Sequence, residues 1–477
     1  MPHAIPGPRG RLFVGSLADF RRDAPNFLRQ VALDYGDVAR VRVGPVNMVL
    51  VSHPDLIEEV LVAAHSRYAK YGMQRAKALI GEGLLTSEGA HHDHQRRLAD
   101  AAFSPAHLAR LAETMTTGID EATAAWRQGT EVDLVPAMLD LTARVIGRAV
   151  LGPLDPPTLA AVAADLTTQL TWLNQYPDPL AFLDRLPLPA NRAMPRARAR
   201  LIALVIQAIK VRRAERGTVG GQTDHADLLT WLGDAVEGGT GEVGGAGVVG
   251  GAAIVGGAAV VGVAADGVGM TDAALAEEAL TLLMAAHERA AMALTWCWYL
   301  LAKHPEVQDR LQSELDGILG GRPPAAEDLG RLSYTQRVIR EALRRFPPVW
   351  IFARRPLADV ELGGYRLPAG TPVFFSQYVV HHDPRWYAQP FRFDPDRWTG
   401  EPVAQDAPPA GAYFPFGRGP RSCLGEHFAR TECAMALAVL AQRWRLLAVP
   451  GSEPVALLPT ITLRPKRPIH VQLEERR

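Results

Sequence analysis

The loop with the clearest chemical potential is FPFGRGPRSCLGEHFAR, residues 414–430, which displays one cysteine. Glycines and an arginine precede Cys423, and a helix-like run follows Gly425. A thiolate is stabilised beside arginine and at the N-terminus of a helix, and glycine lets another group approach the backbone closely. The spacing therefore predicts a cysteine that is held as a thiolate.

Several kinds of site could use such a cysteine. A structural thiol would be buried and inert. A zinc site would need more ligands, and although His427 and Cys433 lie nearby, no paired cysteine or histidine spacing completes the set. A nucleophile would need a histidine base, which the sequence does not place. A dinucleotide-binding loop would need a third glycine where Ser422 stands.

A haem iron with Cys423 as its axial ligand fits each neighbour of the cysteine. Phe416 can pack near the sulfur, and Arg421 can meet a haem propionate. The run Phe416-Gly417-x-Gly419-x-Arg421-x-Cys423-x-Gly425 resembles the haem-thiolate signature of the cytochrome P450 family at every fixed position. The resemblance implies a haem b (iron protoporphyrin IX) cofactor whose iron is bound by Cys423.

Two more segments resemble this family. Glu341-Ala-Leu-Arg344 is similar to its E-x-x-R pair, and FDPDRW, residues 393–398, contains Arg397 where the family has a third member. On its own, a carboxylate three residues from an arginine indicates only a solvated ion pair on one helix face. The resemblance implies a buried structural trio of Glu341, Arg344 and Arg397 that supports the haem pocket.

The resemblance also implies which residues contact the cofactor. The cluster HHDHQRR, residues 91–97, resembles a haem-contacting helix on which one histidine and one arginine, four residues apart, face the propionates. An exposed surface and a separate metal site are the alternatives for this cluster. Arg354 matches a further propionate-binding arginine, and Arg355 is the less favoured choice. The expected cofactor-binding residues are His92, Arg96, Arg354, Phe416, Gly417, Arg421, Cys423 and Gly425.

A long expected helix, residues 272–303, resembles the helix that carries the family's oxygen-activation motif, typically A-G-x-[D/E]-T-[T/S]. The matching residues run from Ala285 to Ala290. An alanine replaces the glycine, an acid is kept, and Arg289 replaces the threonine that helps to deliver protons; an arginine cannot act as an acid or a base. The expected catalytic residues of this distal segment are Ala286, His287, Glu288 and Arg289.

The lost threonine leaves three reactions open. The favoured one is a monooxygenase that hydroxylates or epoxidises a hydrophobic or aromatic small molecule in secondary metabolism, with substrate or water replacing the lost hydroxyl. Oxidative coupling or desaturation without oxygen insertion is the second. Peroxide-driven turnover, in which Arg289 binds a substrate carboxylate, is the third. A haem-binding sensor is the non-enzymatic alternative.

Composition limits the partners and the compartment. Lys plus Arg and Asp plus Glu are equal at 51 each, so no global basic surface indicates nucleic acid. Three cysteines suit a reducing compartment, and the N-terminus lacks a secretory signal, so we expect a cytoplasmic monomer with no stable membrane anchor. No flavin or nicotinamide fingerprint is present, so electrons should come from a ferredoxin and a ferredoxin reductase that dock on the cysteine side, near Arg96, Arg97, Arg418 and Arg430.

The resemblance implies a mainly α (α+β) cytochrome P450 fold that positions these motifs, with a helical domain and a small segregated β-sheet region. Alternation predicts a β-hairpin over 36–52, and Gly-rich turns predict strands within 360–380. We expect one domain over 1–477. Residues 236–268 read as a flexible Gly/Ala/Val insertion, with a partner strand or membrane contact as alternatives. Two variable regions, 70–88 and 172–195, are expected to form pocket walls, with Tyr68, Tyr71, Met73, Trp172, Tyr176 and Phe182 among their residues.

Overall fold

The computed structural model describes residues 4–175, 178–216, 227–237, 271–399, 408–449 and 455–476. Contacts between Cα atoms divide the chain into two compact units. The first unit comprises Met1–Gly72, Ala122–Leu139 and Glu288–Arg477, and the second comprises Met73–Glu121 and Asp140–His287. The single domain over 1–477 stays a prediction.

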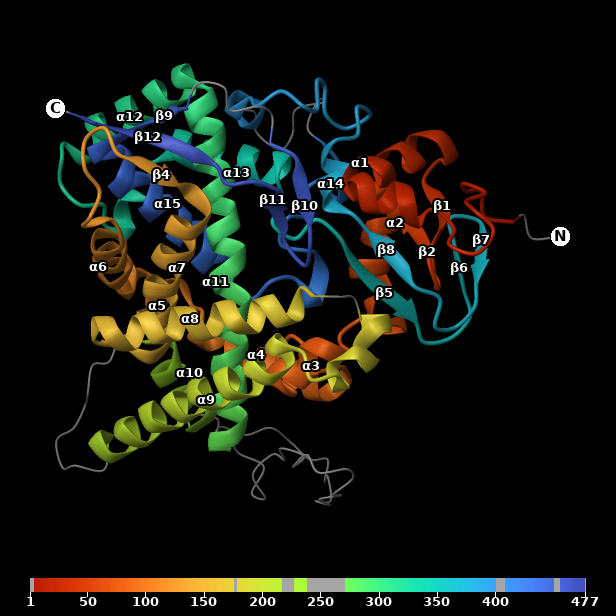
Figure 1. Cartoon of the computed structure of the whole chain (residues 1–477), viewed down its shortest axis with the longest axis horizontal. Helices are drawn as coiled ribbons and strands as arrows, with labels where there is room; N and C mark the ends of the chain where they lie inside the picture. The colour runs from red at the N-terminus through yellow and green to blue at the C-terminus, as the bar shows by residue number, and fades with distance from the viewer. Residues whose placement is uncertain are drawn as a thin grey trace. The chain divides into compact units, whose positions relative to one another are not determined.

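The first unit contains a five-stranded sheet with the order β1-β2-β8-β5-β3. The predicted hairpin over 36–52 is confirmed: β1 (Val38–Val43) pairs antiparallel with β2 (Val46–Val51), and β2 pairs parallel with β8 (Val373–Phe375). β5 (Phe352–Pro356) and β3 (Tyr68–Lys70) complete the sheet, and Figure 1 shows β1, β2, β8 and β5 as neighbours.

Both faces of this sheet are buried, because successive residues of its strands enter different apolar clusters. Val49 and Val51 belong to one cluster, together with Ile57. Met48 and Leu50 belong to another, which includes residues of α1 (Leu17–Tyr35). The two-residue period of a strand explains this division.

The remaining elements of the first unit are mostly helices around short hairpins. α15 packs against α12 and α13, and His304, the N-cap of α12, separates α12 from the helix before it. The helices of this unit are α2 (Pro54–Glu58), α12 (Pro305–Leu319), α13 (Ser333–Arg345), α14 (Gln377–His381) and α15 (Glu426–Arg443). Its other strands are β4 (Glu131–Asp133), β6 (Val360–Leu362), β7 (Tyr365–Leu367), β9 (Trp444–Ala448), β10 (Leu457–Pro459), β11 (Leu463–Pro465) and β12 (His470–Glu475).

The second unit is helical in its described residues. Several of its helices begin where the sequence supplies a cap: the Ser104 hydroxyl accepts from the amide of His107, and the Asp155 carboxylate accepts from the amide of Thr158. Its helices are α3 (Gln74–Ile80), α4 (Gly89–Ala102), α5 (Pro105–Arg110), α8 (Pro156–Leu173), η3 (Asp178–Arg185), α9 (Pro189–Arg216) and α10 (Leu228–Glu237).

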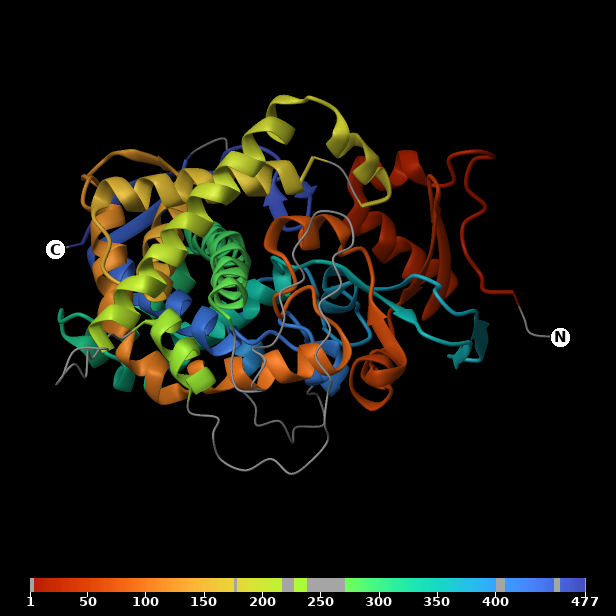
Figure 2. The same cartoon turned by 90° about the horizontal axis from the view of Figure 1, so that it is seen from below.

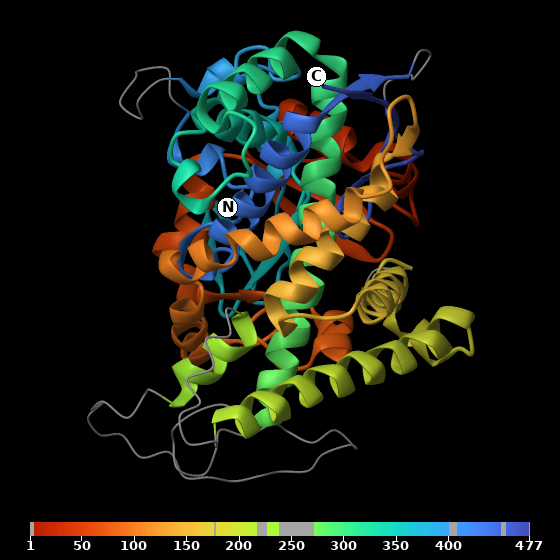
Figure 3. The same ribbon diagram turned by 90° about the vertical axis from the view of Figure 1, so that its left-hand side faces the viewer.

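α8 and α9 pack side by side in the second unit (Figure 2), and α9 is the long yellow-green helix of Figure 3. Three helices cross the boundary between the units along the chain: α6 (Ala112–Thr123), α7 (Leu134–Leu151) and α11 (Asp272–Lys303). The bounds of α11 are those predicted for the long helix, which confirms that prediction.

The two variable regions are joined within the second unit. Arg75 of α3 is buried and donates to the carbonyls of Trp172 and Leu173 at the end of α8, at 2.6 and 2.8 Å. The same guanidinium pairs with Asp184 of η3 at 3.1 Å and stacks over the Trp172 ring. Sequence reasoning missed Arg75, and Tyr176 of the same predicted wall lies outside the described residues.

The predicted insertion over 236–268 begins two residues too early, because α10 continues to Glu237. Residues 238–268 lie outside the described part of the chain. Among the residues that the structure describes, none of the helices combines the length and the apolar composition that crossing a bilayer requires.

Candidate functional site

The cysteine loop of the first unit is a closed turn between a buried aromatic residue and α15. The amide of Cys423 donates to the carbonyl of Phe416 at 2.8 Å, and the amide of Gly417 donates to the carbonyl of Phe414 at 3.0 Å. Cys423 is exposed and lies just before Gly425, the N-cap of α15. The turn therefore presents the thiol outward at the start of a helix, where a thiolate is stabilised.

The glycines of this turn satisfy demands of the chain itself. Gly417 and Gly419 have φ values of +73° and +72°, which favour glycine over any residue with a Cβ. A Cβ on Gly419 would also lie 2.1 Å from the carbonyl oxygen of Leu61. At Gly419 the close neighbour is therefore the protein's own backbone.

The cysteines of the chain differ sharply in environment. Cys297 and Cys433 are buried, and burial raises the pKa of the Cys297 thiol to about 12 and that of the Cys433 thiol well above its usual range. Within the described residues, no three histidine, cysteine or acidic side chains could hold a metal ion together. A cysteine ligand suits an iron whose other ligands come with it, as they do in a porphyrin.

Several cations expected to attract an electron donor have carboxylate partners. Arg418 donates to Glu58 at 2.7 and 3.0 Å, and Arg430 pairs with Glu426 at 2.9 Å. In the second unit, Arg96 pairs with Asp100 at 2.8 Å. These pairings reduce the local positive charge that the sequence indicated, whereas Arg97 is exposed.

The residues expected at the propionates lie in both units. In the first unit, Arg354 is partly buried on β5 and donates to the carbonyl of Ala353 at 3.0 Å, whereas Arg355 is exposed. Arg421 donates to the carbonyl of Tyr68 at 3.0 Å. In the second unit, His92 is buried on α4, and its Nδ1 lies 3.1 Å from Oδ1 of Asp93. Contact with propionates stays a prediction for all of them.

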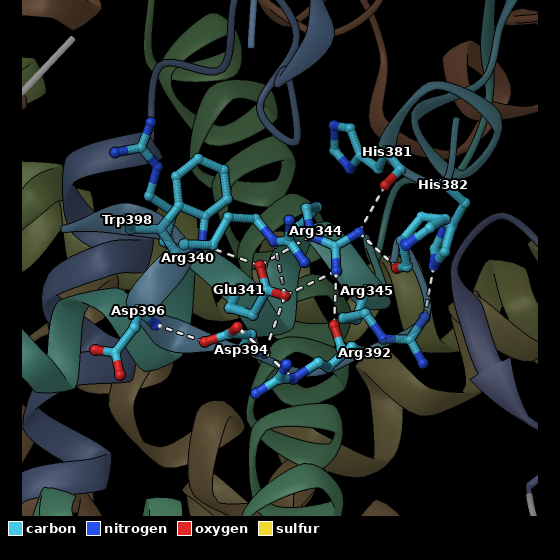
Figure 4. A network of polar contacts seen from close by, with 12 residues as sticks. Arg340, Glu341, Arg344, Arg345, His381, His382, Arg392, Asp394, Asp396 and Trp398 are labelled. Carbon is cyan, nitrogen blue, oxygen red and sulfur yellow. Dashed lines mark hydrogen bonds and ion pairs between the residues drawn. The ribbon is translucent and has the colours of Figure 1, made fainter. Parts of the chain in front are cut away.

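The structure brings together Glu341, Arg344 and Arg397 in the first unit, and Figure 4 shows Glu341 beside Arg344. Arg344 donates to both carboxylate oxygens of Glu341 at 2.7 and 2.8 Å, and both side chains are 0% exposed. Arg397 Nε lies 3.5 Å from Glu341 Oε1. The spacing alone indicated a solvated ion pair, whereas both side chains of this pair are buried. Buried charges are tolerated only when they are paired in this way.

Further donors and acceptors, which sequence reasoning missed, complete this network. Trp398 Nε1 and the amide of Asp394 donate to Glu341 at 3.0 and 3.2 Å. Arg344 also donates to the carbonyls of His381 and Pro390, at 2.7 and 2.8 Å. The FDPDRW segment itself supplies the tryptophan and the amide, so the signal for them was present in the motif.

His381 links this network to the cysteine loop. Its carbonyl accepts from Arg344, and its Nε2 accepts from the amide of Phe414 at 3.2 Å, where the loop begins. Burial, with Arg344 nearby, lowers the pKa of His381 to about 3. The neutral ring can therefore serve as a hydrogen-bond acceptor that fixes the start of the loop.

The distal segment lies on α11 and is divided between the units at His287 and Glu288. In the second unit, His287 is buried, and its Nδ1 lies 3.2 Å from the Thr142 hydroxyl, which donates to the His287 carbonyl at 3.1 Å. In the first unit, Glu288 is buried and accepts from Thr462 at 2.7 Å and from Arg464. Ala286 and Arg289 are partly buried.

Glu432 is a buried acid that sequence reasoning missed. It lies on α15 and is 1% exposed, and neither carboxylate oxygen has a hydrogen-bond partner within the described residues. Burial raises the pKa of Glu432 from its usual 4.5 to about 8. Between those two values, folding requires that this side chain bind a proton.

We therefore expect the stability of the wild-type protein to fall with rising pH through this window, and Glu432→Gln to remove that fall. The folded wild type binds one proton more than the unfolded chain there, so its free energy of unfolding decreases by about 1.4 kcal/mol per pH unit. Urea unfolding at pH values from about 5 to about 8 measures both slopes. Glu426→Gln, at a partly exposed carboxylate, is the control; equal slopes for wild type and Glu432→Gln would contradict this expectation.

Comparison with known proteins gives one family. The family model described as Cytochrome P450 matches residues 5–243 and 258–473. The chain is 38% identical over 450 residues to cyclooctatin synthase of Streptomyces melanosporofaciens, covering 94% of this chain and 90% of that protein. It is 34% identical over 421 residues to cyclooctat-9-en-7-ol 5-monooxygenase of the same organism, covering 88% of this chain and 84% of that protein.

A solved structure has the same fold. The retinoic acid-bound cyanobacterial CYP120A1 matches with a TM-score of 0.79 and 24% sequence identity, over 99% of this chain and 100% of that one. At this identity the likeness supports the fold, and the two relatives above carry the family assignment.

Proposed function

Because this chain belongs to the cytochrome P450 family and is therefore a haem-dependent oxidoreductase, we propose that it hydroxylates or epoxidises a hydrophobic terpenoid in secondary metabolism. The observation that carries this proposal is the outward-facing Cys423 on a closed turn at the start of α15. A haem iron bound through Cys423 would supply dioxygen cleavage, because a thiolate ligand donates electron density.

The protein residues hold and orient this cofactor. Cys423 is the iron ligand in this proposal, and haem b is the cofactor. His92, Arg96, Arg354 and Arg421 are proposed to hold the propionates, since a buried dianion requires hydrogen-bond donors. The Arg344–His381–Phe414 contacts fix the turn that presents the thiol, so they act on the iron ligand indirectly.

The substrate class rests on the relatives. Their names specify cyclooctatin and cyclooctat-9-en-7-ol, which are terpenoid natural products. The two variable regions of this chain supply apolar and aromatic side chains such as Trp172 and Phe182, which suit a ligand of that kind. We propose a polycyclic terpenoid hydrocarbon or alcohol as the substrate, and a ferredoxin with its reductase as the electron source.

Arg289 favours a second candidate reaction. It stands where the family usually has a threonine hydroxyl, and its side chain cannot donate a proton at physiological pH. A peroxide-driven reaction, which needs no proton delivery to dioxygen, is therefore the alternative that Arg289 favours, and oxidative coupling or desaturation without oxygen insertion is a further alternative.

The test is product analysis under heavy-isotope dioxygen. The haem-loaded protein is incubated with a surrogate ferredoxin, its reductase and either cyclooctat-9-en-7-ol or a panel of terpenoid hydrocarbons, and products are read by mass spectrometry. A product with one labelled oxygen supports the monooxygenase. An unlabelled product that is lighter than the substrate by two hydrogens would indicate desaturation or coupling instead of oxygen insertion. Product that forms only with added unlabelled peroxide would indicate a peroxygenase instead of a monooxygenase. The absence of any turnover would favour a haem-binding sensor.

A further inference from the structure

The hairpin of β10 and β11 in the first unit is bonded to Glu288 of α11. The Thr462 hydroxyl donates to Glu288 Oε1 at 2.7 Å, and Arg464 donates to the same oxygen through Nε and forms an ion pair with it through Nη2. Glu288 is buried and Arg464 is partly exposed. One carboxylate oxygen therefore accepts hydrogen bonds from two side chains of a single hairpin.

The same hairpin is held at its backbone by two indole rings. Trp296 of α11 donates to the carbonyl of Leu463, and Trp350 donates to the carbonyl of Thr460, each at 2.8 Å. The amide of Leu463 in turn donates to the carbonyl of Pro348 at 2.9 Å. The turn over 460–462 is thus fixed between α11 and the segment that precedes β5.

We propose that Arg464 is a positioning residue for the reaction, and that the Glu288 carboxylate anchors the turn over 460–462 instead of relaying protons. This inference rests on the proposed function, because it takes the distal segment of α11 to face the substrate. It assigns a role to the acid that the family motif places next to Arg289. In this inference Glu288 holds the turn over 460–462 in place, a role that needs no threonine beside it.

The geometry favours an anchor over a relay. A proton relay needs an acid that can turn between a water molecule and the reacting atoms. Here Glu288 is bound by Thr462 and Arg464. Both belong to a hairpin that is itself hydrogen-bonded on its other side. Truncating one partner of a buried charge pair leaves the other charge without compensation. Loss of either Glu288 or Arg464 should therefore free the same turn.

The experiment is a double-mutant cycle on the haem-loaded protein with Glu288→Gln, Arg464→Gln and both changes together. Hydrogen exchange reports the amide of Leu463, and product ratios and the solvent isotope effect on turnover report the reaction. We expect either single change to speed exchange at Leu463 about tenfold and to alter the product ratio, with no further effect in the double variant. The solvent isotope effect should stay at the wild-type value.

Two further variants keep the result interpretable. Arg467→Gln changes an exposed arginine of the same segment and should leave exchange and product ratio unchanged. Thr462→Val removes one donor but keeps the ion pair and the volume, and it should produce a smaller change of the same kind even where a charge variant fails to fold.

Other outcomes would overturn the anchor. If Glu288→Gln alone lowers turnover and raises the solvent isotope effect while Arg464→Gln leaves turnover and exchange unchanged, Glu288 is a relay. Additive effects in the double variant would also reject the coupling. Failure of the proposed function looks different: the wild type itself would lack a thiolate-type ferrous carbonyl spectrum or any product, while hydrogen exchange would still report whether the pair holds the turn.

Discussion

Replacing Cys423 by serine is expected to abolish the thiolate-type spectrum of the ferrous carbonyl complex and all product formation. A serine hydroxyl keeps the size of the side chain but is not a thiolate, so the electron density that drives dioxygen cleavage is lost. The turn itself should survive, because the hydrogen bonds that close it are made by backbone amides of Gly417 and Cys423. Absorbance spectra with and without carbon monoxide, and product yield, are the measurements.

Cys433→Ala is the matched control for that substitution. Cys433 is buried on α15, so it should tolerate the change with a modest loss of stability and no change of spectrum. A Cys423→Ser protein that retained the thiolate-type spectrum would show that another sulfur binds the iron, and the assignment of Cys423 would be wrong.

Glu341→Gln is expected to lower the free energy of unfolding by about 3–5 kcal/mol and to impair haem retention, because it leaves the Arg344 guanidinium buried without a counter-charge. Glu341 accepts two bonds from Arg344, one from Trp398 and one from the amide of Asp394. Through His381 the damage should reach the start of the cysteine loop at Phe414. Denaturant unfolding and haem content after gel filtration measure both effects.

Asp396→Asn offers a comparison in the same region of the first unit. Asp396 pairs with Arg310 at 2.6 Å and with Arg337 at 2.9 Å, but its side chain is 46% exposed. An exposed pair contributes about 0–1 kcal/mol, so this variant should remain near the wild type. Equal losses for the two carboxylates would mean that burial does not set the importance of the Glu341 pair.

Elements whose ends or turns are marked by residues close together in the sequence were predictable. The bounds of α11 follow from a Thr271 hydroxyl that accepts from the amide of Ala274 and from His304-Pro305 at the other end. The hairpin over 36–52 follows from alternation and from Gly44, which has a φ of +58° in its two-residue turn. The cysteine turn was predictable because its fixed residues lie within one short run, 416–425.

Contacts between distant segments could not be predicted from one sequence. Nothing near Glu288 indicates Arg464, which follows 176 residues later. Likewise, nothing in the sequence near Gly419 indicates that Leu61 lies against it. Glu432 lies in an apolar helix, where a lone acid has no pattern to mark its missing partner. In each case the deciding neighbour is set by packing, which a local pattern does not encode.

The long-range pairing in the first unit also sets an order of events during synthesis. β2 pairs with β8, which joins Val49 to Val373, and the Gly419 turn rests on Leu61. A ribosome releases the N-terminal strands long before their partners exist, whereas the two stretches of the second unit are complete by His287. Cys423, the proposed iron ligand, is among the last groups to emerge, so the cofactor could bind through it only when almost the whole chain has been made. Until their partners are synthesised, the early strands have unpaired edges, and the nascent chain is therefore prone to aggregate.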